Sequence, residues 1–350
     1  MRSKNNSFTL YILSFIIALL ILFNYISYID DRVILPIYEN TQLSNKTKSL
    51  IDFNVFSDIY NKNINSIVTV QSYLLQKSSA FKRSAGVIIT DDGYILTTSH
   101  TIRYGENISV LTKDLHNYKA SIVGVDLCLD LALLKINSIR KFSSIEFGTM
   151  NDVKIGSFVM SIGNMFGLID SATMGIVGGI NRHRNGTLIP FIQVDSLLNR
   201  GSSGGAVINT KGHFIGMNMA VLKENGGYNT GIGFVLPVNL IKFSLNQLKS
   251  KGVVDRIALG INGLIDNYQI IPNNKNGASV AGVIITGIIN NSIAYKSGLK
   301  IDDKIVEFNN RPINTIGDLY MCLLLTKSSD RVEIGIVRNK EKKFIIINEV

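Results

Sequence analysis

Ser203 lies in a stretch whose residue types suit a nucleophile. In Asn199–Val207, Gly201, Gly204 and Gly205 surround two adjacent serines. Gly201 permits a tight turn in which its own N–H group and that of Ser203 converge on one point. Such a pair can stabilise the negative charge that develops on a carbonyl oxygen under attack. Taken alone, the stretch also fits an ordinary glycine-rich surface turn.

A serine nucleophile needs a base that takes its proton and an acid that orients the base. Of the four histidines, His100 follows the apolar run Tyr94–Ser99, and we expect it to be held rigidly where that strand ends. The other three, His116, His183 and His213, lie in polar turns and fit surface roles.

Two acids compete for the orienting role. Asp126 and Asp130 both lie in the apolar stretch Asp126–Leu134, where a buried carboxylate is costly unless it is hydrogen-bonded. A histidine N–H would satisfy Asp130, although spacing alone does not exclude Asp126. The order His, Asp, Ser along the chain is that of the chymotrypsin-like double barrel. This predicts that Ser203 attacks a peptide carbonyl, that His100 relays the proton to the leaving amine, and that Asp130 fixes the tautomer of His100.

The elements that must position these residues are short strands. Between Ser66 and Pro237, apolar runs alternate with turn signals, which indicates an all-β barrel pair. The apolar spacing in Val238–Ser250 then predicts an amphipathic helix that ends at Gly252. We therefore expect a mainly β fold, with a trypsin-like double β-barrel domain at 55–254.

The last segment, 255–350, has a different pattern and predicts a small α+β domain. Its predicted helices are Ser292–Ser297 and Ile316–Leu325. Its predicted strands are Val283–Ile288, Lys304–Phe308, Arg331–Val337 and Lys343–Ile347.

The N-terminal segment predicts one transmembrane helix. Residues 8–29 are uncharged and apolar, and a helix of that length spans about 33 Å, enough for the hydrocarbon core. No small-residue cleavage site follows, which disfavours a cleaved signal peptide. Arg2 and Lys4 predict that 1–7 is cytoplasmic and that the chain beyond a tether at 30–54 is outside.

Composition excludes few functions. The net charge of +10 is scattered over the chain, so we do not infer nucleic-acid binding. Cys128 and Cys322 lie in apolar runs of different domains, and we expect two buried free thiols. Neither has metal-ligand spacing, so no metal or cofactor is expected.

Taken together, these motifs resemble the HtrA family of trypsin-fold serine proteases. The resemblance covers nearly all of the chain after the anchor and is carried by Ser84–Ile88, Tyr94–His100, Asp130–Ile136, Ser161–Asn164, Gln193–Asp195, Gly201–Val207 and Gly231–Pro237. It favours Asp130, because the family's acid precedes Leu-Ala. The chain departs from the family at Ser202, Ser99 and Thr101, where Asn, Asn and Val are usual, and none of these changes removes a catalytic group. Ser202 adds a rival hydroxyl.

Ala294–Asn309 resembles the PDZ signature A-x-x-(A/S)-G-L-x-x-x-D-x-I. In it, Gly298 allows the turn out of a short helix and Asp303 caps the next turn. A PDZ domain binds a peptide as an added strand and holds its terminal carboxylate on backbone N–H groups. The resemblance assigns that role to the loop Ala258, Leu259, Gly260 and Ile261, which also fits an ordinary strand entry.

The predicted anchor and single PDZ domain match the membrane-anchored branch of the family. That branch implies a homotrimer in the inner membrane with its protease domain in the periplasm. It implies activation by C-termini of unfolded outer-membrane proteins and cleavage of a membrane-bound anti-sigma factor. Arg182, with Arg184 as a rival, matches the arginine that links peptide binding to the active site. The alternatives are a general quality-control protease and a catalytically silent peptide-binding scaffold.

Overall fold

The structure is a computed structural model that describes residues 19–20, 54–74, 81–103, 105–165, 168–183, 187–196, 201–223, 229–267 and 281–348. The chain divides into two units, Met1–Phe53 and Asn54–Val350. Apart from Leu19 and Leu20, the predicted anchor at 8–29 lies outside the described residues. Within the described ranges, no helix has the length and apolar character needed to cross a membrane.

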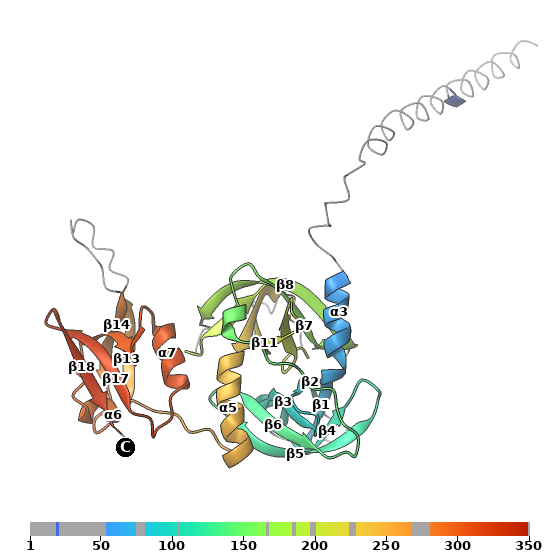
Figure 1. Ribbon diagram of the computed structural model, residues 1–350, viewed down its shortest axis with the longest axis horizontal. Coiled ribbons are helices and arrows are strands. Elements are labelled where there is room, and N and C mark those ends of the chain that lie inside the picture. The colour runs from blue at the N-terminus through green and yellow to red at the C-terminus, as the bar shows by residue number, and fades with distance from the viewer. Residues whose placement is uncertain are drawn as a thin grey trace, which may run out of the picture. The chain divides into compact units, whose positions relative to one another are not determined.

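The second unit begins with two closed six-stranded barrels, which confirms the predicted double barrel (Figure 1). The first barrel has the strand order β1-β2-β3-β6-β5-β4. Its strands are β1 (Ile67–Leu74), β2 (Phe81–Ile88), β3 (Tyr94–Thr98), β4 (Gly105–Leu111), β5 (Asn117–Asp126) and β6 (Leu131–Ile136).

The second barrel repeats the arrangement with the order β10-β11-β12-β9-β8-β7. Its strands are β7 (Phe158–Met165), β8 (Leu168–Arg182), β9 (Phe191–Val194), β10 (Ala206–Asn209), β11 (Phe214–Lys223) and β12 (Asn229–Pro237). The 3-10 turn η1 (Ile64–Ser66) directly precedes β1, the 3-10 turn η2 (Met150–Asp152) lies between β6 and β7, and the short helix α4 (Ser99–Ile102) lies between β3 and β4.

Strand β6 explains why part of the sequence is apolar without alternation. Leu131 and Leu133 belong to the large core cluster that β6 shares with residues of the second barrel. Ala132 and Leu134 point the other way, into the core of the first barrel. Because successive side chains of a strand point to opposite faces, a strand covered on both faces needs a continuous apolar run.

Two helices flank the barrels. Helix α5 (Val238–Lys251) buries Leu240, Ile241 and Leu248, and it ends at Gly252, whose φ of 74° is left-handed, as the sequence predicts. Helix α3 (Asn54–Asn63) was not predicted, and it begins at the last residue of the predicted tether. Its apolar residues Val55, Phe56, Ile59 and Tyr60 recur at helical spacing over only about two turns, and they pack against the large core cluster.

The remaining residues form the predicted α+β domain. Its sheet has the order β13-β14-β15-β17-β18, with β16 paired to β15. The elements are β13 (Ile261–Asn267), β14 (Gly282–Ile288), α6 (Ile293–Lys296), β15 (Lys304–Phe308), β16 (Arg311–Pro312), α7 (Ile316–Leu324), β17 (Val332–Arg338) and β18 (Glu341–Ile347). Strands β13 and β16 were not expected from the sequence. The domain has a core of its own, which includes Val283, Ile305 and Ile334.

Candidate active site

The structure brings His100 and Asp130 together where β3 ends and β6 begins. His100 Nδ1 lies 2.6 Å from Asp130 Oδ2, and the His100 backbone N–H donates to Asp130 Oδ1 at 2.9 Å. A carboxylate only accepts, so Nδ1 carries the proton of this pair and Nε2 is left to accept another. The backbone at Asp130 has a φ of 54°, a left-handed turn that sends its side chain back toward β3.

The charge on Asp130 is stabilised despite its partial burial. Burial raises the pKa of this carboxyl, but the hydrogen bonds from His100 and Ser99 outweigh that effect. The pKa of Asp130 therefore lies below its ordinary value. The carboxylate is charged at neutral pH and can compensate a positive charge on the neighbouring imidazole.

Asp126, the competing acid, has other partners. Its carboxylate accepts from Arg256 Nη1 at 3.0 Å and Nη2 at 2.7 Å, and from Ser244 Oγ at 2.7 Å. The Leu129 backbone N–H also donates to it at 3.3 Å. The side chain is 2% exposed, so this is a buried, bidentate ion pair. Its hydrogen bonds fix the turn between β5 and β6 and leave Asp130 as the acid next to His100.

Ser203 sits in a turn that the packing of both barrels shapes. A Cβ at Gly204, whose φ is 81°, would lie 2.2 Å from the Ala85 carbonyl oxygen on β2. Thr97 on β3 donates its hydroxyl to that same carbonyl at 2.8 Å. The Ala85 N–H donates to the Ser203 carbonyl at 3.0 Å. The turn that carries Ser203 thus rests on β2 and on β3, where Thr97 lies three residues before His100.

The two serines of the turn differ in accessibility. Ser202 is 3% exposed, whereas Ser203 is half-buried. The Ser203 hydroxyl donates to the Met219 carbonyl oxygen at 3.2 Å and is not hydrogen-bonded to His100. Among the described residues, the backbone N–H groups of Gly201 and Ser203 have no acceptor. Gly201 has a φ of 95°, a backbone conformation that is strained for any residue with a side chain.

Ser99 is a site residue that sequence reasoning missed. Its hydroxyl donates to Asp130 Oδ1 at 2.6 Å, and its own N–H donates to the Asp130 carbonyl at 2.9 Å. The residue is 6% exposed. The available signal was its position directly before His100, because a residue next to His100 in the chain also lies close to Asp130.

The predicted carboxylate loop lies between α5 and β13. Gly260 has a φ of 77°, and a Cβ there would lie 2.2 Å from Ser292 Cβ. The carbonyl groups of Leu259 and Gly260 accept hydrogen bonds from Ala294 and Ile289, both at 2.8 Å. The PDZ signature behaves as predicted: Gly298 has a φ of 84°, and the next residues are capped by a carboxylate.

That carboxylate is Asp303, which accepts from the Lys300 N–H at 2.8 Å and from Arg338 at 2.6 Å through both oxygens. The ion pair ties the turn after α6 to strand β17. The predicted cap is therefore present, with a partner that the local sequence did not indicate.

Arg182 ends strand β8, pairs with Phe191 and is exposed. Its Nε would lie 2.5 Å from a Cβ at Gly179, so the side chain folds back along its own strand. Its neighbour Asn181 donates to Asp318 Oδ1 at 3.1 Å, at the start of α7. The rival Arg184 lies outside the described residues.

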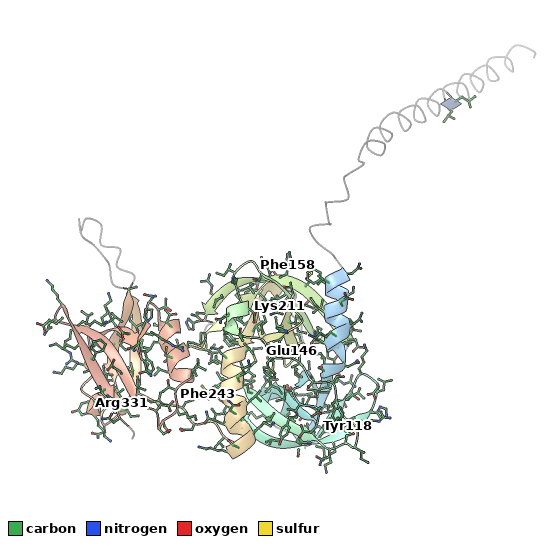
Figure 2. The ribbon with its side chains drawn as sticks, in the orientation of Figure 1. Tyr118, Glu146, Phe158, Lys211, Phe243 and Arg331 are labelled. Carbon is green, nitrogen blue, oxygen red and sulfur yellow. The ribbon has the colours of Figure 1, made fainter. Side chains whose placement is uncertain are left out.

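Two of the remaining histidines have partners at the surface, and one of the two cysteine predictions was wrong. His116 pairs with Asp114 at 2.9 Å, and His213 pairs with Glu146, labelled in Figure 2, at 3.1 Å. Cys322 is buried as predicted, whereas Cys128 is exposed. Cys128 is exposed because it lies at the tip of the β5–β6 turn, where the next residue, Leu129, is the one whose side chain is completely buried.

Comparison with protein families identifies both domains. Residues 84–217 match the trypsin-like peptidase domain, and residues 246–348 match the PDZ domain. A "Probable periplasmic serine endoprotease DegP-like" of Buchnera aphidicola subsp. Baizongia pistaciae is 32% identical over 327 residues, 92% of this chain and 70% of that protein. The periplasmic pH-dependent serine endoprotease DegQ of Escherichia coli is 34% identical over 73% of this chain and 56% of its own length.

Solved structures agree with this assignment. The HtrA-type protease AlgW with a tripeptide has a TM-score of 0.71 at 25% identity, covering 84% of this chain and 96% of that one. The serine endoprotease from Yersinia pestis has a TM-score of 0.61 at 27% identity with the same coverage. The fold and site define a trypsin-like serine peptidase with a PDZ domain. The chain belongs to the HtrA family of serine endoproteases.

Proposed function

We propose that Ser203, His100 and Asp130 form the catalytic triad of this endoprotease. Ser203 Oγ attacks the scissile carbonyl while His100 Nε2 takes its proton and then delivers it to the leaving amine. Asp130 holds the tautomer of His100 and compensates its charge. The observation that carries the proposal is the 2.6 Å contact between His100 Nδ1 and Asp130 Oδ2. In the free state, Ser203 must turn from the Met219 carbonyl toward His100.

The same turn provides the oxyanion hole in this proposal. The N–H groups of Gly201 and Ser203 are without acceptors among the described residues, as a site that receives a developing oxyanion requires. Both are backbone groups, so the presence of Ser202 in place of the family's usual asparagine does not remove either donor.

Exchanging the two serines one at a time tests the triad. Ser203→Ala should abolish cleavage of an unfolded protein substrate, leaving only the ~10³–10⁴-fold advantage over water that binding and the oxyanion hole supply. Ser202→Ala is the matched control and should retain cleavage. The opposite outcome would assign the nucleophile to Ser202.

We further propose that the protein is of the DegS type: anchored in the inner membrane, with its protease domain in the periplasm. Its PDZ domain would bind C-termini of unfolded outer-membrane proteins, and its substrate would be a membrane-bound anti-sigma factor. The apolar segment at 8–29 supports this, as do the periplasmic relatives. A general quality-control protease is the second candidate, because the curated relatives are of the DegP and DegQ kinds. A silent scaffold is disfavoured by the geometry at His100.

A topology reporter separates location from activity. A reporter enzyme that works only after export, fused after residue 40, should be active if the anchor leaves the rest of the chain in the periplasm. The same fusion lacking residues 8–29 should be inactive. Activity of a cytoplasm-specific reporter at the same position would overturn the topology.

Regulation through the β8–β9 loop is also a proposal. Arginine suits a switch because its planar fork can bind backbone carbonyls or a carboxylate in either of two loop arrangements. A peptide shifts such an equilibrium only through different affinities for the two states. Arg182→Ala should therefore reduce peptide-stimulated cleavage without weakening peptide binding. Unchanged stimulation in both Arg182→Ala and Arg184→Ala would exclude the loop as the sensor.

An exposed apolar patch supports the proposed homotrimer. Phe158, labelled in Figure 2, is 44% exposed on β7 and packs edge-on against Phe56 of α3, with ring centroids 6.0 Å apart. On the neighbouring strand β8, Met174 is 49% exposed and lies two residues from Ile176, which pairs with Phe158. Exposed apolar side chains that lie next to one another often mark a surface that associates with another protein, whereas single scattered ones do not.

A further inference from the structure

A cavity of about 590 Å³ joins the carboxylate loop to the protease domain. One wall consists of Ala258–Ile261 and residues of α7, as expected of a PDZ groove. The other wall is not part of the PDZ domain: it is the β5–β6 turn, which presents Leu127 and Cys128 to the cavity. Two residues further along the same turn stands Asp130.

The cavity has the chemistry of a site for a peptide C-terminus. Among the described residues, the backbone N–H groups of Ala258, Leu259 and Gly260 have no acceptor. Consecutive free N–H groups with one residue in a left-handed conformation form a concavity that binds anions. The rest of the lining is largely aliphatic and includes Leu264 and Leu323. A carboxylate at the end of an apolar chain satisfies both features.

The turn residues at this wall are unusual for their exposure. Leu127 is 72% exposed, and Cys128 is exposed beside it. Tyr320 of α7 lies close to Cys128: burial raises the pKa of Tyr320, and the nearby thiol adds to the rise. An exposed leucine at the edge of an apolar cavity gains burial when a ligand fills the cavity.

The turn is held rigidly on either side of the two exposed residues. Asp126 is fixed by the bidentate Arg256, and Leu129 is completely buried. A ligand that contacts Leu127 and Cys128 therefore touches the segment that carries Asp130.

We propose that the peptide site is composite, and that an apolar peptide C-terminus bound at Ala258–Gly260 packs directly on Leu127 and Cys128 of the protease domain. This rests on the peptide-binding part of the proposed function and adds a specificity surface outside the PDZ domain. The β5–β6 turn of the protease domain then contacts the peptide side chains that precede the terminal residue and contributes to peptide specificity. Binding stiffens the turn that carries the triad's acid.

Thiol protection tests the contact directly in the full-length chain. The Ser203→Ala variant prevents cleavage of the probe, a Gly/Ser peptide that ends in Val-Val-Phe with a free carboxylate. Binding is measured by fluorescence anisotropy, and alkylation of Cys128 and Cys322 by mass spectrometry. Saturating peptide should slow alkylation of Cys128 about tenfold or more, while the amidated peptide should bind about tenfold more weakly for lack of its charged hydrogen bonds.

A substitution distinguishes direct contact from an indirect change in thiol exposure. Leu127→Ala should raise the peptide Kd about fivefold, because it removes apolar surface that the ligand buries. Leu115→Ala is the matched control: Leu115 is 71% exposed in the β4–β5 turn and does not line the cavity. Its Kd should equal that of the parent chain.

The outcomes separate the two proposals. The composite site is overturned if the peptide binds but does not slow alkylation of Cys128, and if Leu127→Ala binds it as tightly as the parent chain does. That result would still leave a PDZ domain that binds peptides. Peptide that does not bind would overturn the peptide-binding function itself, and the composite site with it.

Discussion

Removing the hydroxyl of Ser99 should weaken catalysis although Ser99 touches no substrate. Ser99→Ala deletes a 2.6 Å hydrogen bond to Asp130 Oδ1. Hydrogen bonds to charged groups contribute about 1.5–3 kcal/mol. The Asp130 side chain is 36% exposed and keeps two donors from His100, so water replaces part of the loss. We therefore expect Ser99→Ala to raise the activation free energy by about 1 kcal/mol, which lowers kcat/KM about fivefold.

The assay separates positioning from stability. Steady-state cleavage of an unfolded protein should give a lower kcat with little change in KM, because Ser99 orients the acid and not the substrate. Ser72→Ala is the matched control: Ser72 is completely buried, and its hydroxyl has no partner among the described residues. It should leave kcat unchanged. Equal kcat values for the Ser99→Ala, Ser72→Ala and parent enzymes would refute the positioning role.

The Ser99→Ala variant should also change how the stability of the fold depends on pH. The folded-state pKa of Asp130 is depressed below 3.8, so its charge stabilises the fold above that value, and the stabilisation is lost as pH falls through the folded pKa. Ser99→Ala moves this pKa back up. The free energy of unfolding should therefore be lower than that of the parent at neutral pH, and the difference should shrink below about pH 4. A difference that persists undiminished in acid would mean that the loss comes from packing.

Three further substitutions test other parts of the structure. Arg256→Ala leaves Asp126 charged, buried and unpaired and should lower the free energy of unfolding by about 3–5 kcal/mol in urea, while the double variant with Asp126→Asn should recover part of it. Gly204→Ala places a methyl group against the Ala85 carbonyl at a left-handed φ; kcat should fall at least tenfold, and an unchanged kcat would show that the turn adapts. Phe158→Asp should shift the mass measured by light scattering toward the monomer, and an unchanged mass would exclude this patch as the interface.

The architecture followed from local patterns. Alternating apolar runs predicted the barrels, and Gly252 ended its helix in the left-handed conformation that glycine adopts without strain. Helix α3 was missed although Val55, Phe56, Ile59 and Tyr60 recur at helical spacing, because a helix of about two turns is stabilised mainly by packing against the barrel. Strand β13 was missed because Ile261–Asn267 lacks clear alternation and is stabilised by pairing with β14.

The site depended on contacts between residues far apart in the chain. Sequence alone indicated a serine flanked by glycines, a histidine after a strand and an acid in an apolar turn, since those types reflect local needs of geometry and burial. Spacing alone did not choose between Asp126 and Asp130, and only the family resemblance favoured Asp130, because the partner that occupies Asp126 is Arg256, 130 residues away in the chain. Nor did the sequence predict the Ser99 hydrogen bond or the exposure of Cys128. The β5–β6 turn contains several polar groups, and their partners are set only when distant segments of the chain pack against the turn. The physical reason is that each buried charge must be hydrogen-bonded in the folded protein.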